Sequence, residues 1–110
     1  MRYLAIGRYN AQGAAGILKD GLTSRKEVLK EFTEREGGTL IGLWGVESAD
    51  YDFVILSEGD IPPALWAANS LGQRSMGHIE VLHTYTLVET EDVDAALKAS
   101  NPVTRAPGDA

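Results

Sequence analysis

The chain contains no cysteine and comparatively few basic residues. Without cysteine it can form no disulfide framework, no thiolate zinc site and no cysteine nucleophile. Its 10 Lys and Arg residues stand against 16 Asp and Glu residues, which gives a formal net charge of −6. Binding to nucleic acids and to anionic membrane surfaces depends on Lys and Arg. We therefore expect neither of these partners.

Long apolar runs and metal-binding patterns are also missing. No apolar stretch approaches the ~18 residues of a membrane-spanning helix, and no signal-peptide pattern follows Met1. These features predict a cytoplasmic protein. The two histidines, His78 and His83, do not form a His-x-His pattern. The sequence therefore predicts no metal site and no cofactor.

Four segments show the alternation of a β-strand, and each is apolar on both of its faces. They are Arg2–Tyr9, Thr39–Val46, Tyr51–Glu58 and His78–Val88. In the third segment, Tyr51, Phe53 and Ile55 lie on one face, and Val54 and Leu56 lie on the other. A sheet with two apolar faces needs cover on both sides.

Helical patterns separate these strands and follow the last of them. A short helix is expected over Ala11–Lys19, and a longer one begins at Ser24, which forms a capping box with Glu27. Two more helices are expected after Asp60 and Thr90, which serve as caps. In the helix after Asp60, the apolar side is expected to carry Leu65, Ala68 and Leu71. Residues 1–100 are expected to form one domain, and residues 101–110 a disordered tail.

The order strand, helix, strand, strand, helix, strand predicts an α+β fold. Right-handed crossovers place both connecting helices on the same face of a four-stranded antiparallel sheet, as in a ferredoxin-like βαββαβ sandwich. The opposite apolar face is then bare. Such a face marks an interaction surface, and pairing with a second copy is the simplest way to cover it. We therefore expect a homodimer or a higher homo-oligomer.

His83 is the first candidate for catalysis. In a regular strand it shares a mainly apolar face with Ile79, Val81, Tyr85 and Leu87, which predicts partial burial. Its imidazole could act as a general acid or base. The alternative is a core histidine whose hydrogen bonds are satisfied by Tyr85, a backbone carbonyl or water. His78 is expected to lie on the opposite face.

Asp52 and Arg8 are the next candidates. Asp52 could orient a histidine or accept a substrate proton. Its alternative is structural, through hydrogen bonds to backbone N–H groups or an ion pair with Arg8 on the neighbouring strand. Arg8 could instead stabilise a developing oxyanion.

Aromatic residues are the candidates for holding a ligand: Tyr9, Trp44 and Tyr51. Gly42 and Gly45 flank Trp44, and missing side chains beside an indole could leave room for a flat ligand. The alternative is that these glycines accommodate sheet twist, while Trp44 lies in the core or at a dimer contact. Trp66 is expected to pack between its helix and the sheet.

Several short motifs resemble those of GYD-domain proteins. They are the Tyr-x-x-x-Gly of Tyr9–Gly13, Ser24-Arg25, Gly37-Gly38, Asp50-Tyr51-Asp52 and the closing Leu87–Asp92. The resemblance covers about residues 2–98, with alanine at position 49 in place of the eponymous glycine. It implies a ferredoxin-like fold of the dimeric α/β-barrel kind. Relatives by fold include cofactor-free monooxygenases, isomerases, cyclases and purely structural subunits.

The sequence is compatible with two functions. The first is a cofactor-independent enzyme (isomerase, cyclase, dehydratase or monooxygenase type) acting on a small aromatic or polyketide-like molecule. His83 would transfer the proton, and Asp52 or Tyr85 would set its tautomer. The second is a non-catalytic subunit that binds a ligand or only forms an oligomer.

Overall fold

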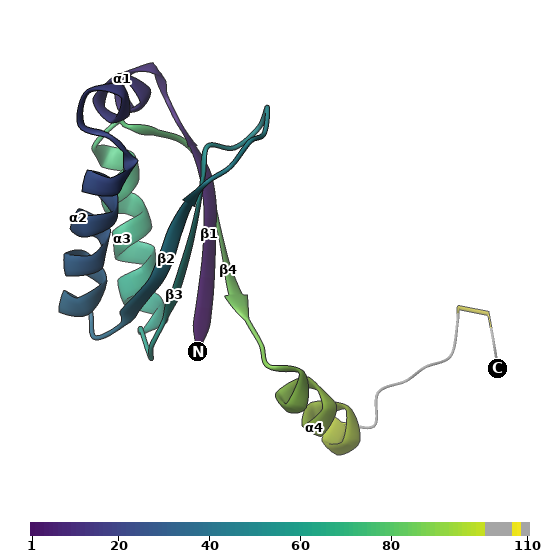
Figure 1. Ribbon diagram of the computed structural model, residues 1–110. Helices are drawn as coiled ribbons and strands as arrows, with labels where there is room; N and C mark the ends of the chain where they lie inside the picture. Colours follow the sequence, from purple (N-terminus) through teal and green to yellow (C-terminus); the bar gives the residue numbers. More distant parts are fainter. Residues whose placement is uncertain (101–106, 109–110) are drawn as a thin grey trace.

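The computed structural model describes residues 1–100 and 107–108 (Figure 1). The tail predicted over 101–110 therefore lies outside the described residues, apart from positions 107–108. No helix in the described part of the chain is both long enough and apolar enough to cross a membrane.

The elements follow one another in the predicted order. They are β1 Arg2–Tyr9, α1 Ala11–Asp20, α2 Leu22–Arg35, β2 Thr39–Gly45, β3 Phe53–Glu58, α3 Pro63–Ser75, β4 Ile79–Leu87 and α4 Thr90–Ser100. The strands form one sheet in the order β2-β3-β1-β4, and every neighbouring pair is antiparallel. The predicted α+β, ferredoxin-like arrangement is therefore confirmed.

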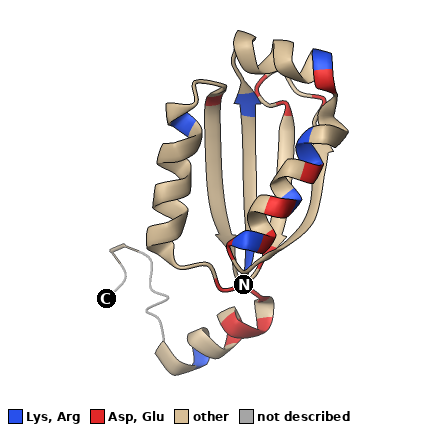
Figure 2. Cartoon of the chain, turned by 90° about the vertical axis from the view of Figure 1, so that its left-hand side faces the viewer, with Lys and Arg blue, Asp and Glu red and all other residues tan. Residues whose placement is uncertain are grey.

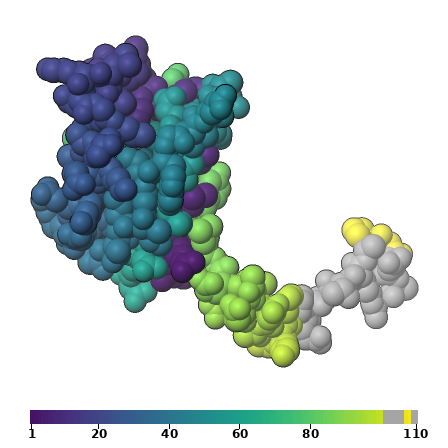
Figure 3. Space-filling view, viewed as in Figure 1, coloured from purple at the N-terminus to yellow at the C-terminus, as the bar shows by residue number. Residues whose placement is uncertain are grey.

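The helices α1, α2 and α3 all lie on the same side of the sheet (Figure 1). Tyr3, Ala5 and Phe53 point to this side and are buried. Within residues 1–100 no helix covers the other side, because α4 leaves the end of β4 and stands apart from the body (Figure 3). The prediction that this chain supplies cover for only one face is confirmed.

The uncovered side of the sheet, here called the bare face, is apolar at its centre. In the register of β1 with β3, Leu4 pairs with Leu56 and Ile6 with Val54. All four side chains are only half-buried. Around them lie Trp44 (49% exposed), Tyr85 (53%) and Leu87 (39%). A single subunit therefore leaves a continuous apolar layer in contact with water.

Strand β4 departs from regular alternation. Its register against β1 shifts between Arg8 and Tyr9, so that Val81 pairs with Arg8 but Ile79 pairs with Tyr9. A bulge of this kind moves the residues beyond it to the other face. Ile79 therefore faces the helices and does not share a face with His83, contrary to the prediction. Because β4 is irregular and begins only at Ile79, the odd separation of His78 and His83 does not place His78 opposite His83.

The helices α2 and α3 differ from prediction in their beginning and their orientation. Helix α2 begins at Leu22, and the Ser24 hydroxyl donates to the Gly21 carbonyl at 3.1 Å, so Ser24 is not its cap. In α3 the predicted apolar side is wrong, since Leu71 is 69% exposed. The orientation of α3 is fixed by buried Ile61 before it and by Trp66, whose ring centroid lies 4.9 Å from that of Tyr3.

Candidate functional site

A cavity of about 100 Å³ lies between the helix-covered face of the sheet and the helices α2 and α3. These two helices stand apart, so that the strands are seen between them in Figure 2. Most of the wall is apolar: Ala5, Leu29, Phe32, Phe53, Ile55, Ile61, Ile79 and Leu82. The spacing of Leu29, Phe32 and Thr33 places one side of α2 against this space.

The floor of the cavity depends on a glycine in β1. The rings of Tyr9 and Phe53 lie against each other, with centroids 4.8 Å apart. A Cβ atom on Gly7 would lie 2.7 Å from Cζ of Phe53 and 2.5 Å from the backbone oxygen of Val81. Gly7 therefore leaves room for the Phe53 ring and for the close approach of β4.

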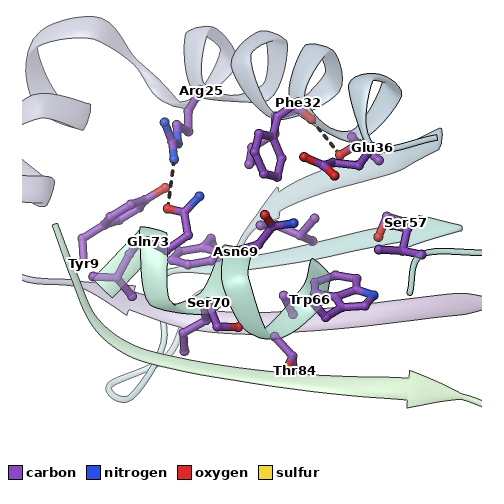
Figure 4. Close-up of a pocket in the computed structure, with 18 residues that line it drawn as sticks. Tyr9, Arg25, Phe32, Glu36, Ser57, Trp66, Asn69, Ser70, Gln73 and Thr84 are labelled. Carbon is purple, nitrogen blue, oxygen red and sulfur yellow. Dashed lines mark hydrogen bonds between the residues drawn. The ribbon is translucent and has the colours of Figure 1, made fainter. Parts of the chain in front are cut away.

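One end of the cavity is polar. Arg25 of α2 points toward Tyr9 and toward Gln73 of α3 (Figure 4), and its Nη2 donates to Gln73 Oε1 at 3.5 Å. Asn69 and Ser70 continue this polar side along α3. The side that α3 turns to the cavity thus carries three polar side chains, while Leu71 of the same helix is exposed to water.

Two groups in the cavity wall bear on its chemistry. Burial raises the pKa of the Tyr9 hydroxyl from its ordinary value of 10.0, although the nearby charge and hydrogen bond of Arg25 act against this rise. Tyr9 is therefore a protonated hydrogen-bond donor at neutral pH. The indole Nε1–H of Trp66 is buried and has no acceptor among the residues described. Buried donors normally have partners, so a ligand oxygen or a water fits here.

Asp52 contributes to the site through the backbone. Its Oδ2 accepts a hydrogen bond from the N–H of Tyr9 at 2.9 Å. Its own N–H donates to the carbonyl of Gly7 at 2.8 Å. This geometry matches the structural alternative for Asp52, because it fixes the end of β1 from which the Tyr9 ring projects. Arg8 does not pair with Asp52, since its Nε lies 3.0 Å from Glu80 Oε2 and its Nη1 donates to the Asp50 carbonyl.

His83 lies on the bare face, on the opposite side of the sheet from the cavity. It pairs in register with Ile6 and is exposed in the single subunit, so the predicted partial burial is not found there. Its ring makes an edge contact with Tyr51, with centroids 6.1 Å apart. Tyr85 is two residues further along the same face. Of the predicted catalytic residues, none lines the cavity.

Trp44 also belongs to the bare face. A Cβ atom on Gly42 would lie 2.6 Å from Cη2 of Trp44, so the indole itself covers this glycine. The space that the sequence suggested for a flat ligand is occupied by the Trp44 ring. Of the three predicted ligand-binding residues, only Tyr9 lines the cavity.

Sequence reasoning missed the polar residues of the two helices. Arg25 stands among other charged residues of α2, and Asn69, Ser70 and Gln73 form no recognised motif. A signal existed, because Trp66, Asn69, Ser70 and Gln73 share one helical face. The apolar residues on the other side of α3 concealed it. Within the described residues, no group of three or more His, Cys, Asp or Glu side chains could hold a metal ion.

Comparison with known proteins gives one match. The family model described as GYD domain matches residues 3–97. Neither the search of curated proteins nor that of solved structures found a match.

Proposed function

We propose that this chain, which belongs to the GYD domain family, binds a small, largely apolar molecule in the cavity beneath α2 and α3. The observation that carries the proposal is the combination of an apolar wall with polar groups gathered at one end. Ligand sites commonly have this composition, since apolar walls supply affinity and a few polar groups fix orientation. The volume of about 100 Å³ suits a molecule built on one ring.

The polar side of α3 supports this reading. A helix packed on a sheet normally turns its apolar side inward. Here Asn69, Ser70 and Gln73 line an internal space while Leu71 is exposed to water. Polar side chains that face an internal space without partners lower the stability of an empty protein, and a ligand with polar atoms offsets that loss.

Filling the cavity from α3 is expected to abolish binding. Ser70→Leu places a larger side chain into the cavity, whereas Ala68→Leu adds comparable bulk on the exposed side of the same helix. Binding of benzamide to the unmodified protein should be measurable by calorimetry or NMR, with Kd of about 1 mM or tighter. We expect Ser70→Leu to weaken it at least about tenfold and Ala68→Leu to leave it unchanged. Equal binding by both variants would contradict the cavity as the site.

Catalysis in the same cavity is a second candidate, favoured by the position of Tyr9. A protonated phenol beside a guanidinium can donate a proton or a strong hydrogen bond to an oxygen of a bound molecule. Such a step serves isomerisation, cyclisation or dehydration of a small aromatic or polyketide-like compound without a cofactor. Tyr9 would then take the proton-transfer role that the sequence suggested for His83.

Substitution of Tyr9 separates catalysis from binding. Tyr9→Phe keeps the ring on Phe53 but removes the hydroxyl, so turnover should fall about 100-fold while benzamide binding changes little. Because the protonated form is required and its pKa is raised above 10.0, activity should persist below that pH. It should be lost only as pH rises through the raised pKa. Full activity of Tyr9→Phe would exclude this role.

We further propose that the bare face is covered by a second copy of this chain. The charges at the ends of the face pair within one subunit: Arg2 with Glu58 at 3.6 Å, and Arg8 with Glu80 at 3.0 Å. Since these charges cancel, two copies can meet there although each has a net charge of −6. What remains between the pairs is the apolar layer around Leu4, Ile6, Tyr85 and Trp44.

Helix α4 offers a further contact for the same partner. It stands apart from the body of its own subunit (Figure 3), and Val93 and Leu97 on one side of it are 44% and 51% exposed. These residues are four positions apart and so form one apolar stripe. A partner subunit on the bare face places apolar surface within reach of this stripe, which the described residues of a single copy leave exposed.

A further inference from the structure

Among the described residues that line the cavity, Arg25 alone carries a full positive charge. It belongs to the first turn of α2, is half-buried, and projects toward Tyr9 and Gln73 (Figure 4). Its two partners, Gln73 and Tyr9, are neutral. Its guanidinium donates to the amide oxygen of Gln73 and approaches the Tyr9 hydroxyl.

The lack of a carboxylate partner sets Arg25 apart from Arg2 and Arg8. Arg2 and Arg8 pair with glutamates, whereas no ion pair involves Arg25 in the described part of the chain. Glu36 also lines the cavity, but it lies eleven residues further along the chain, directly after the end of α2. That separation corresponds to about 16 Å at the rise of an α-helix. The other described Lys and Arg side chains without an ion pair are exposed, whereas Arg25 is half-buried in the cavity wall.

The beginning of α2 adds to the positive potential around Arg25. Its first turn contains no acidic residue, and no side chain caps its N–H groups. The N-terminal end of a helix carries a partial positive charge that favours a nearby anion. Tyr9, at this end of the cavity, is a neutral donor, and the Asp52 carboxylate bonds the backbone N–H of Tyr9.

We infer that the molecule bound in the cavity is a small carboxylic acid with a single-ring or comparable apolar body, and that Arg25 binds its carboxylate. This inference rests on the proposed binding function and adds the charge of the ligand. A planar guanidinium matches a carboxylate with two parallel hydrogen bonds. Gln73 and Tyr9 hold the guanidinium at the polar end, while Phe32, Phe53 and Leu29 surround the apolar body.

The test compares benzoate with the neutral benzamide, which has nearly the same shape. Affinities are measured by calorimetry for the unmodified protein, Arg25→Gln and Lys26→Gln. Lys26 is the neighbouring cation on α2 but is exposed and outside the cavity, so Lys26→Gln makes the same change in net charge elsewhere. Arg25→Lys keeps the charge, removes the planar fork and serves as a second variant.

We expect benzoate to bind the unmodified protein at least about tenfold more tightly than benzamide. Arg25→Gln should weaken the binding of benzoate about 10- to 100-fold and that of benzamide less than about twofold. The benzoate affinity of Arg25→Lys should lie between those of the unmodified protein and Arg25→Gln. Lys26→Gln should leave both affinities unchanged. If benzoate and benzamide bind equally well and Arg25→Gln changes neither affinity, the inference is overturned while the proposed function stands. Failure of both probes to bind would overturn the two together.

Discussion

Replacing Tyr85 by glutamate is expected to convert a homodimer into a monomer. Tyr85 is 53% exposed on the bare face and pairs in register with Leu4, close to the centre of the proposed contact. In a symmetric dimer the substitution buries two carboxylates without partners. We expect the dissociation constant of the dimer to rise about 100-fold or more, as measured by sedimentation at micromolar concentration.

The matched control for this substitution lies on α3. Leu71 is 69% exposed on the opposite side of the molecule, and Leu71→Glu adds the same charge there. It should leave the dimer intact and the free energy of unfolding nearly unchanged. A Tyr85→Glu variant that sediments as a dimer would show that this face is not the contact, and so would an unmodified protein that is monomeric throughout.

Replacing Gly7 by alanine is expected to destabilise the fold strongly. The new Cβ would lie 2.5 Å from the backbone oxygen of Val81 and 2.7 Å from the Phe53 ring. Because one of these atoms belongs to the backbone of β4, the collision cannot be relieved by turning a side chain. We expect the free energy of unfolding to fall by about 3 kcal/mol, measured by denaturant titration.

Gly16 provides the opposite case. It lies within α1, and a Cβ atom there meets nothing within 4 Å. Alanine favours helix over glycine, so Gly16→Ala should raise the free energy of unfolding by about 0.5–1 kcal/mol. A Gly7→Ala variant as stable as the unmodified protein would contradict the close packing of Phe53 against Gly7 of β1.

The strands and their order were predictable because their signal is local. Apolar alternation located each strand to within two residues, as in β1 and β3, and the short link before Phe53 indicated an antiparallel pair. The one-sided helical cover followed from counting helices against apolar faces. The family resemblance, drawn from the motifs around Tyr9 and Asp50–Asp52, is confirmed by the match over residues 3–97.

The candidate site was not predictable in the same way, because it depends on two features without a local signal. The register shift beside Tyr9 moves Ile79 to the helix side, and a sequence does not reveal which residue of a strand is bulged. The orientation of α3 depends on how Trp66 packs against Tyr3, and these two residues are distant in sequence. Hydrophobicity alone therefore predicts Leu71 on the inner side of α3 and gives no sign that the polar residues line a cavity.

The central claim is that the two faces of the sheet have separate roles, and the two tryptophans report on them individually. Trp66 lines the cavity and Trp44 lies on the bare face. Each indole N–H gives its own signal in a ¹H–¹⁵N NMR spectrum. Adding benzoate or benzamide is expected to shift the Trp66 signal and leave the Trp44 signal in place. Dilution from the dimer to the monomer is expected to shift the Trp44 signal and leave the Trp66 signal in place. Ligand-dependent movement of Trp44 without Trp66, or a Trp44 signal indifferent to dilution, would contradict this division of roles.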